Sequence, residues 1–135
     1  MIKIEDLINI CSLAGIEIMK IYDKSGISKM RIEYKDDHSP LTLADKKSHD
    51  IICNSLNKLY PEIPILSEEG SQVPYEERKK WNKFWLIDPI DGTKEFIKKN
   101  GEFTVNIALI KNEKPIHGVI YWPVKKIIYY TINKK

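Results

Sequence analysis

The stretch Trp85-Leu-Ile-Asp-Pro-Ile-Asp-Gly-Thr93 decides the fold, because it joins a strand, two acidic residues and the start of a helix. The apolar run from Phe84 to Ile87 predicts a strand that leads directly into Asp88. Asp91-Gly92 is a common turn pair, and a short helix from Thr93 to Lys98 is expected after it. The stretch therefore places two carboxylates between a strand and a helix.

Strands dominate the sequence around this stretch. Three segments rich in β-branched and aromatic residues follow it, Phe103 to Ile110, Ile116 to Trp122 and Ile127 to Ile132, and they predict an antiparallel meander. Before it, a short strand from Ile63 to Leu66 is expected, and the polar segment 71–83 has room for one helical turn. The second half of the chain is thus predicted to form one sheet.

Two amphipathic helices are expected before the strands. Apolar or small residues recur every three or four positions from Ile4 to Tyr22, which predicts a helix with one buried stripe. A second helix should begin at Thr42, whose hydroxyl and Asp45 three residues later fit a capping box. The segment 25–39 between the helices is expected to be an irregular connector or a short hairpin. The order predicts a single α+β domain over residues 1–135, with two helices packed on an antiparallel sheet.

Composition places the chain among globular proteins. Apolar residues make up 42% of its 135 residues, a content that excludes disorder. Its net charge of +3 is too small to predict nucleic-acid binding. The apolar runs are too short to cross a membrane, and no secretory signal is recognised. We therefore expect a cytoplasmic protein, while the mild basicity leaves open a peripheral association with the inner face of the membrane. Cys11 and Cys53 fit reduced core thiols better than a disulfide or a zinc site.

Acidic residues follow two of the predicted strands. Glu68-Glu69 comes after the first strand, and Asp88 and Asp91 come after the second, so the two pairs should meet at one edge of the sheet. Carboxylates this close repel one another unless a cation compensates them, and hard oxygen ligands select Mg²⁺. Purely structural interpretations of these residues are the alternative to a metal site: Glu-Glu is often solvated surface, Asp-Gly is often a turn, and Asp45 could do no more than cap its helix.

The helix start at Gly92-Thr93 lies beside these acids. Free N–H groups and the positive end of the helix dipole at such a start favour a phosphate oxygen. A metal ion and a phosphate at one point are what metal-assisted hydrolysis of a phosphate ester needs. The three histidines, His38, His49 and His117, show no ligand spacing and are expected to have surface or structural roles.

The string WLIDPIDGT at residues 85–93 closely resembles the signature of the Mg²⁺-dependent, lithium-sensitive phosphatase superfamily that includes inositol monophosphatase. Two earlier blocks, Ser39-Pro-Leu-Thr-Leu-Ala-Asp45 and Ser67-Glu68-Glu69, resemble the other N-terminal blocks of that superfamily in the expected order. The extension from Asp91 to Ile110 is more similar to the 3'(2'),5'-bisphosphate nucleotidase branch than to the inositol branch. The resemblance implies the N-terminal half of the layered αβαβα fold of this superfamily.

The resemblance also implies roles for the residues in these blocks. The implied metal ligands are three side chains and one backbone carbonyl: Glu68, Asp88, Asp91 and the carbonyl of Ile90. The residues implied to contact the scissile phosphate are Glu68, Ile90, Asp91, Gly92 and Thr93. Asp45 and Thr93 would orient and activate the attacking water, and Glu69 would lie one step removed from the metal. A complete site would hold two or three Mg²⁺ ions.

Members of this superfamily are about twice as long as the chain, and their second half normally carries a Trp-Asp motif whose Asp is a further metal ligand. We therefore expect a truncated N-terminal half, whose exposed sheet edge and face favour self-association or a separate C-terminal half as partner. The implied activity is Mg²⁺-dependent hydrolysis of the 3'-phosphate of adenosine 3',5'-bisphosphate to AMP and phosphate, a nucleotide salvage step linked to sulfate assimilation. An inositol or sugar phosphate phosphatase is one alternative, and an inactive metal-binding half-domain or assembly partner is the other.

Overall fold

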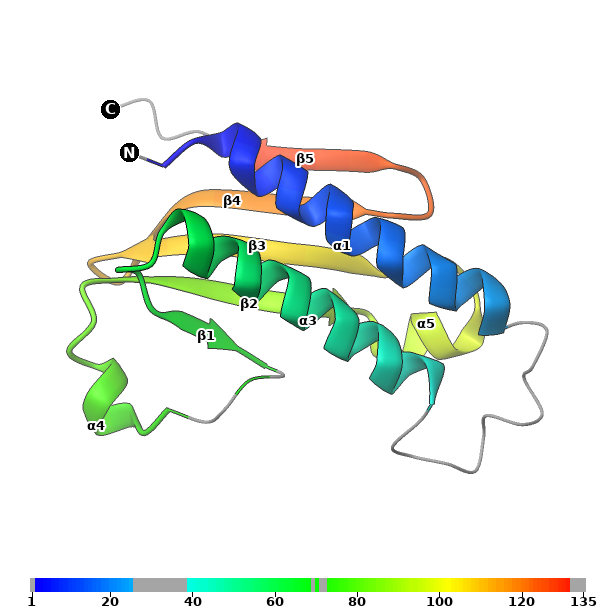
Figure 1. The fold of residues 1–135 in the computed structure, drawn as a ribbon, viewed down its shortest axis with the longest axis horizontal. Helices are drawn as coiled ribbons and strands as arrows, with labels where there is room; N and C mark the ends of the chain where they lie inside the picture. The colour runs from blue at the N-terminus through cyan, green and yellow to red at the C-terminus, as the bar shows by residue number, and fades with distance from the viewer. Residues whose placement is uncertain (1, 26–38, 69, 71–72, 132–135) are drawn as a thin grey trace.

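The computed structural model describes residues 2–25, 39–68, 70 and 73–131, and it shows two long helices lying on one face of a sheet (Figure 1). In chain order the elements are α1 (Ile4–Ser25), α3 (Pro40–Leu59), β1 (Ile65–Ser67), α4 (Tyr75–Arg78), β2 (Lys83–Asp91), α5 (Thr93–Lys98), β3 (Thr104–Lys111), β4 (Lys114–Trp122) and β5 (Ile127–Thr131). The predicted α+β class is confirmed. The connector expected between the helices lies outside the described residues. No helix in the described ranges is long and apolar enough to cross a membrane.

The sheet has its strands in the order β1-β2-β3-β4-β5. Strands β3 to β5 pair antiparallel, which confirms the predicted meander, and β2 pairs antiparallel with β3. The β3–β4 turn contains Asn112 and Glu113 at φ values of 50° and 67°, which suit a tight hairpin whose backbone twist matches that of its strands. Strand β1 adds to β2 in parallel, because the segment that contains α4 carries the chain back to the same end of the sheet.

One face of the sheet meets the helices and forms the core. In β3 the buried residues Val105, Ile107 and Leu109 alternate with less buried ones, because successive side chains of a strand point to opposite faces. Helix α1 approaches β4 closely at Gly15, where a Cβ atom would lie 2.3 Å from the Tyr121 ring. Outward-facing side chains of the sheet remain more open, including Leu86 at 43% and Ile120 at 46% exposure.

Several boundaries differ from the sequence prediction, and three of them lie close to the acidic residues. Helix α3 begins at Pro40, because the Ser39 hydroxyl accepts a hydrogen bond from the Thr42 N–H and proline is well suited to the first helical position. The predicted cap at Thr42 is therefore wrong, and Asp45 lies inside the helix instead of closing its end. Strand β1 begins two residues later than expected, at Ile65, and β2 continues through the acidic residues to Asp91.

Candidate active site

The carboxyl ends of β1 and β2 lie side by side. The two strands pair in parallel, with Ser67 beside Ile87 at the last step of the ladder. Glu68 and Asp88 are the next residues of the two chains after this pair, with Glu68 in the turn that follows β1 and Asp88 still inside β2. Glu68 is exposed and Asp88 is half-buried, so solvent reaches this edge of the sheet.

An irregularity in β2 brings a third carboxylate to the same face. Asp88 pairs with Asn106 of β3, and the next paired residue is Asp91, which lies opposite Thr104. Three steps along β2 thus match two steps along β3, so β2 contains one extra residue, as in a β-bulge. Because Asn106 and Thr104 share one face of β3, their partners Asp88 and Asp91 also share a face.

Helix α3 holds this bulge from the core side. The hydroxyl of Ser48, which is 0% exposed, donates a hydrogen bond of 2.9 Å to the backbone carbonyl oxygen of Pro89. Asp45 lies three residues earlier, nearly one helical turn, on the same face of α3, and is only 8% exposed. Helix α3 therefore contacts the β2 bulge through Ser48, and Asp45 is buried on the same face of this helix.

The bulge leads into the left-handed turn at Gly92. Gly92 has φ 99°, and a Cβ atom there would lie 2.8 Å from the carbonyl oxygen of Glu102. Glycine is required at this position because both the backbone conformation and the close approach exclude a side chain. Thr93 is the first residue of α5 and is exposed. Since α5 has only six residues, its helix dipole is small.

An aromatic cluster and a lysine fix α5 against the end of α1. The rings of Tyr22, Phe96 and Phe103 have centroid separations of 4.9 to 5.2 Å. Lys99 Nζ donates a hydrogen bond to the Tyr22 carbonyl oxygen and lies 3.7 Å from the centroid of the Tyr22 ring. These contacts satisfy a helix-end carbonyl with a cation and hold the Gly92-Thr93 start of α5 in place.

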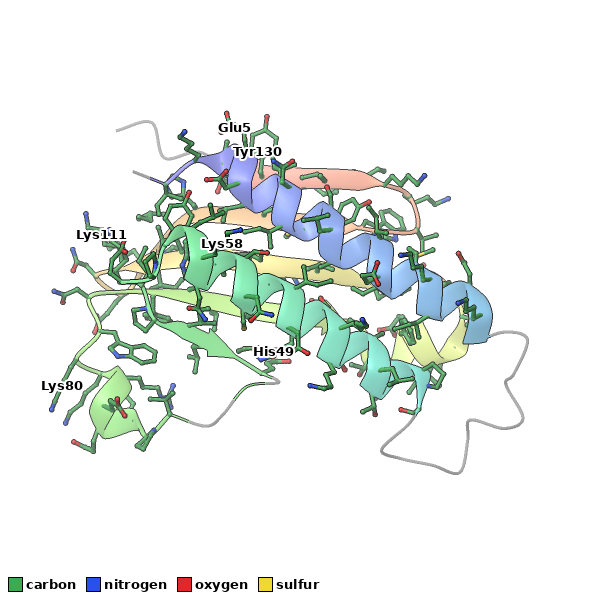
Figure 2. The ribbon with its side chains drawn as sticks, in the orientation of Figure 1. Glu5, His49, Lys58, Lys80, Lys111 and Tyr130 are labelled. Carbon is green, nitrogen blue, oxygen red and sulfur yellow. The ribbon has the colours of Figure 1, made fainter. Side chains whose placement is uncertain are left out.

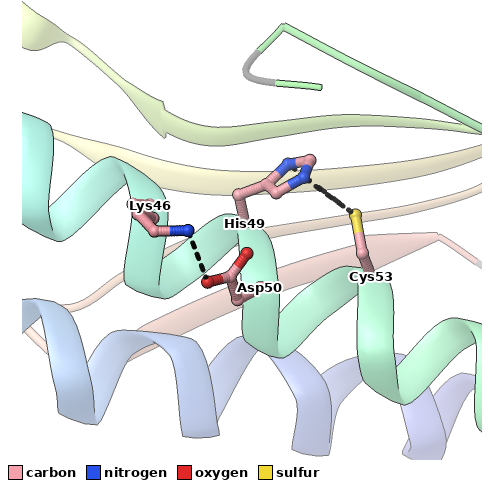
Figure 3. A network of polar contacts seen from close by, with 4 residues as sticks. All are labelled: Lys46, His49, Asp50 and Cys53. Carbon is pink, nitrogen blue, oxygen red and sulfur yellow. Dashed lines mark hydrogen bonds and ion pairs between the residues drawn. The ribbon is translucent and has the colours of Figure 1, made fainter. Parts of the chain in front are cut away.

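His49 has a structural position beside the site. It extends from α3 to the end of β1, where its Nδ1 lies 2.9 Å from the Ser67 hydroxyl (Figure 2). Cys53, one helical turn further along, places its Sγ 3.6 Å from His49 Nε2, and Lys46 forms an ion pair with Asp50 on the same helix (Figure 3). The structural role expected for His49 is confirmed in that its ring hydrogen-bonds the residue before Glu68.

The thiols do not favour a soft metal. Burial raises the pKa of Cys11 to about 12, and burial together with the charge of Asp50 raises the pKa of Cys53 to about 11. Both cysteines are free, and both stay protonated at neutral pH, whereas zinc requires a thiolate.

Oxygen atoms make up the donor set at this edge of the sheet. The carboxylates of Glu68, Asp88 and Asp91 and the carbonyl of Ile90 are hard ligands, which fits a hard divalent cation such as Mg²⁺. In the described ranges no three His, Cys, Asp or Glu side chains lie close enough together to hold a metal. Asp88 and Asp91 both belong to β2, whereas Glu68 follows β1, so the expected ligands come from two neighbouring strands.

Two residues of this region were not predicted from the sequence, and one predicted residue is not described. Ser48 and Asn106 contact the bulge directly, and the only sequence signals for them are a position one turn after Asp45 and an interruption of the apolar run in β3. Glu69 lies outside the described residues.

Comparison with known proteins agrees with this geometry. The model of the inositol monophosphatase family matches residues 4–135. The chain belongs to this family. Members of this family are metal-dependent. The resemblance carried by the WLIDPIDGT block is therefore confirmed.

Similar proteins with curated names include bisphosphate nucleotidases. The 3'(2'),5'-bisphosphate nucleotidase CysQ of Salmonella typhimurium is 48% identical over 132 residues, which are 98% of this chain and 52% of that protein. CysQ of Escherichia coli is 50% identical over 129 residues, which are 93% of this chain and 51% of that protein. The crystal structure of CysQ from Bacteroides thetaiotaomicron superposes with a TM-score of 0.85 at 45% identity, covering 97% of this chain and 46% of that chain. The chain thus spans about half the length of the relatives that it matches.

Proposed function

We propose that this chain provides the metal- and phosphate-binding half of a Mg²⁺-dependent phosphatase that converts adenosine 3',5'-bisphosphate to AMP and phosphate. The observation that carries this proposal is the placement of Glu68, Asp88 and Asp91 along the carboxyl ends of two parallel strands, followed by a backbone turn suited to phosphate. The named nucleotidases that are 48% to 51% identical to the chain support the choice of substrate. In cells the reaction is a nucleotide salvage step linked to sulfate assimilation.

The metal ligands in this proposal are Glu68, Asp88, Asp91 and the carbonyl oxygen of Ile90, and a complete site holds two or three Mg²⁺ ions. When bound, the cation supplies Lewis-acid polarisation of the phosphoryl group and stabilises the charge on the leaving oxygen. The N–H groups at Gly92 and Thr93 donate to phosphate oxygens and hold the phosphorus in position.

Asp45 and Thr93 act on the attacking water. The buried carboxylate of Asp45 approaches the bulge from α3 and accepts a proton from the water, while the Thr93 hydroxyl orients it. The water oxygen bonds to phosphorus as the bond between phosphorus and the 3'-oxygen breaks, and the departing 3'-oxygen takes up a proton from solvent to become the 3'-hydroxyl of AMP. A water nucleophile requires no phosphorylated enzyme intermediate. Ser48 contributes indirectly, because its bond to the Pro89 carbonyl holds the helix of Asp45 against β2.

The partner in this proposal is a small phosphorylated nucleotide in the cytoplasm, and not a nucleic acid. The sheet face opposite the helices exposes Leu86 and Ile120 and gives the chain a surface for self-association or for a separate C-terminal half. A peripheral association with the inner face of the membrane would depend on the net charge of +3.

Phosphate release from adenosine 3',5'-bisphosphate tests the proposal. The purified chain is assayed with and without Mg²⁺, next to Asp91→Asn and to Asp50→Asn as a matched control, since Asp50 lies on α3 in an ion pair with Lys46. We expect Mg²⁺-dependent release that Asp91→Asn loses and Asp50→Asn keeps. Inositol and sugar phosphates are assayed in parallel. If phosphate is released faster from either of them than from adenosine 3',5'-bisphosphate, that compound is the preferred substrate and the assignment of the nucleotide is wrong.

Two outcomes would contradict the proposal. Wild-type activity in Asp91→Asn would exclude the carboxylate from the reaction. No release by a folded wild-type chain that still binds Mg²⁺ would assign this chain to the metal-binding half-domain alternative and leave the activity with longer members of the family.

A further inference from the structure

Asn106 is in contact with both ends of the acidic bulge. It lies opposite Asp88 in the β2–β3 ladder, and its Nδ2 donates a hydrogen bond of 3.2 Å to Asp91 Oδ2. Asp88 and Asp91 are the carboxylates on either side of the extra residue in β2. A single neutral side chain therefore links the two positions to which the proposed function assigns the metal.

The orientation of the Asn106 amide follows from its neighbours. An ionised carboxylate only accepts hydrogen bonds, so Asn106 must present its NH₂ group to Asp91. Its carbonyl oxygen, Oδ1, is then directed to the Thr104 hydroxyl, which donates to it across 3.5 Å. Thr104 is itself the register partner of Asp91, so the three side chains form a short chain across β2 and β3.

A neutral donor suits a metal-binding carboxylate better than a cationic one. Lysine or arginine at position 106 would neutralise Asp91 and compete with a bound cation. The Asn106 amide fixes one oxygen of Asp91, leaves the other oxygen unengaged by that bond, and preserves the negative charge. Asp91 is exposed, so this contact limits the orientations that its carboxylate would otherwise sample in water.

We propose that Asn106 is a positioning residue, which holds the Asp91 carboxylate in the orientation that binds Mg²⁺. This inference rests on the proposed function, because it deepens the role given there to Asp91. Groups that hydrogen-bond metal ligands from behind are commonly worth 10- to 100-fold in metal affinity. Removing the Asn106 amide is therefore expected to weaken Mg²⁺ binding by roughly tenfold or more.

Mg²⁺ affinity and stability together test the inference. Mg²⁺ binding to the full 135-residue chain is measured by competition against Mn²⁺, followed by electron paramagnetic resonance, and thermal unfolding is measured without metal. Asn106→Ala should lose affinity, whereas Asn57→Ala, at an exposed position on α3, should keep it. Thr104→Val, which retains the shape of its side chain, should give a smaller loss and provides a second variant if Asn106→Ala does not fold.

A double exchange separates positioning from simple stabilisation. Asp91→Asn combined with Asn106→Asp again pairs an amide with a carboxylate across the strands, but moves the charge to β3. We expect it to recover thermal stability relative to Asn106→Asp alone and to remain deficient in Mg²⁺ binding. The side-chain amide signals of Asn106 should have different chemical shifts in NMR spectra of the wild-type chain and of Asp91→Ala.

Each outcome decides the inference. Unchanged Mg²⁺ affinity in Asn106→Ala, or wild-type affinity in the double exchange, would overturn it, and so would a wild-type chain that binds no Mg²⁺. A wild-type chain whose Mg²⁺ affinity depends on Asn106 but which releases no phosphate would refute the proposed function for this chain and leave the positioning role in place.

Discussion

Replacing Ser48 with alanine is expected to destabilise the chain and loosen the acidic bulge. The Ser48 hydroxyl makes a buried hydrogen bond of 2.9 Å to the Pro89 carbonyl, and the side chain is 0% exposed. Its removal leaves a buried acceptor without this donor, which costs about 1 to 3 kcal/mol of unfolding free energy. For a domain of this size that corresponds to a fall in Tm of roughly 3 to 12 °C.

Ser12→Ala provides a matched control on the other helix. The Ser12 hydroxyl donates over 2.9 Å to the carbonyl oxygen of Ile8, four residues earlier in α1, a bond within one helical turn. Alanine is the better helix former, so the change in unfolding free energy should stay within about 0.5 kcal/mol.

Urea unfolding followed by circular dichroism measures the unfolding free energies of Ser48→Ala and Ser12→Ala under the same conditions. If Ser48→Ala and Ser12→Ala unfold at the same urea concentration with equal slopes, the bond to Pro89 does not secure α3 against β2. A loss confined to Ser48→Ala, together with weaker Mg²⁺ binding, would link the stability of the bulge to the site.

Three further predictions concern the turn, the thiols and the attachment of α5. Gly92→Ala should lower the unfolding free energy by about 1 to 3 kcal/mol and abolish Mg²⁺-dependent phosphate release, because φ is 99° and the added Cβ meets a carbonyl oxygen at 2.8 Å. Gly118→Ala is the control: its added Cβ meets nothing closer than 3.7 Å, so both stability and phosphate release should be unchanged. Burial raises the pKa values of Cys11 and Cys53 to about 12 and 11, so both thiols ionise at lower pH in the unfolded chain than in the folded one. Their contribution to stability is therefore full below about pH 8.5 and should decline as the pH rises above it. Unfolding free energies at pH 8 and pH 10, compared between the wild-type chain and its Cys→Ser variants, would measure this decline. Lys99→Met should lower Tm by a few degrees, since the helix-end carbonyl loses its donor and the ring loses its cation, and an unchanged Tm would contradict that account.

The elements with strong local signals could be predicted from the sequence. Helix α5 has the expected bounds, Thr93–Lys98, because a glycine precedes it and a lysine in the left-handed conformation follows it. The strands after it contain β-branched and aromatic residues with few interruptions, and each was found within a few residues of its predicted range. The capping-box pattern at Thr42 predicts too late a start for α3, because Ser39 and Pro40 before it favour an earlier cap and first turn.

The contacts that assemble the candidate site lie beyond local patterns. Ser48 reaches Pro89 across 41 positions of sequence, and Asn106 reaches Asp91 across 15. Neither residue type is unusual at its position, since serine occurs on many helix faces and asparagine at many strand positions. Only the antiparallel pairing of β2 with β3 and the packing of α3 on β2 bring these groups together, and both depend on the whole fold.

The extra residue in β2 explains why two acids three positions apart can serve one site. In a regular strand, residues 88 and 91 would point to opposite faces, because side chains alternate. The shift in register between Asp88 and Asp91 cancels this alternation, and the hydrogen bond from Asn106, the partner of Asp88, to Asp91 is its direct consequence. Pro89 suits the irregular position, since it has no N–H to contribute to the ladder, and its carbonyl bonds instead to Ser48 of α3. The same backbone irregularity thus turns Asp91 toward the open face of the sheet and ties the strand to the helix that carries Asp45, so that the acidic group depends on both layers of the fold.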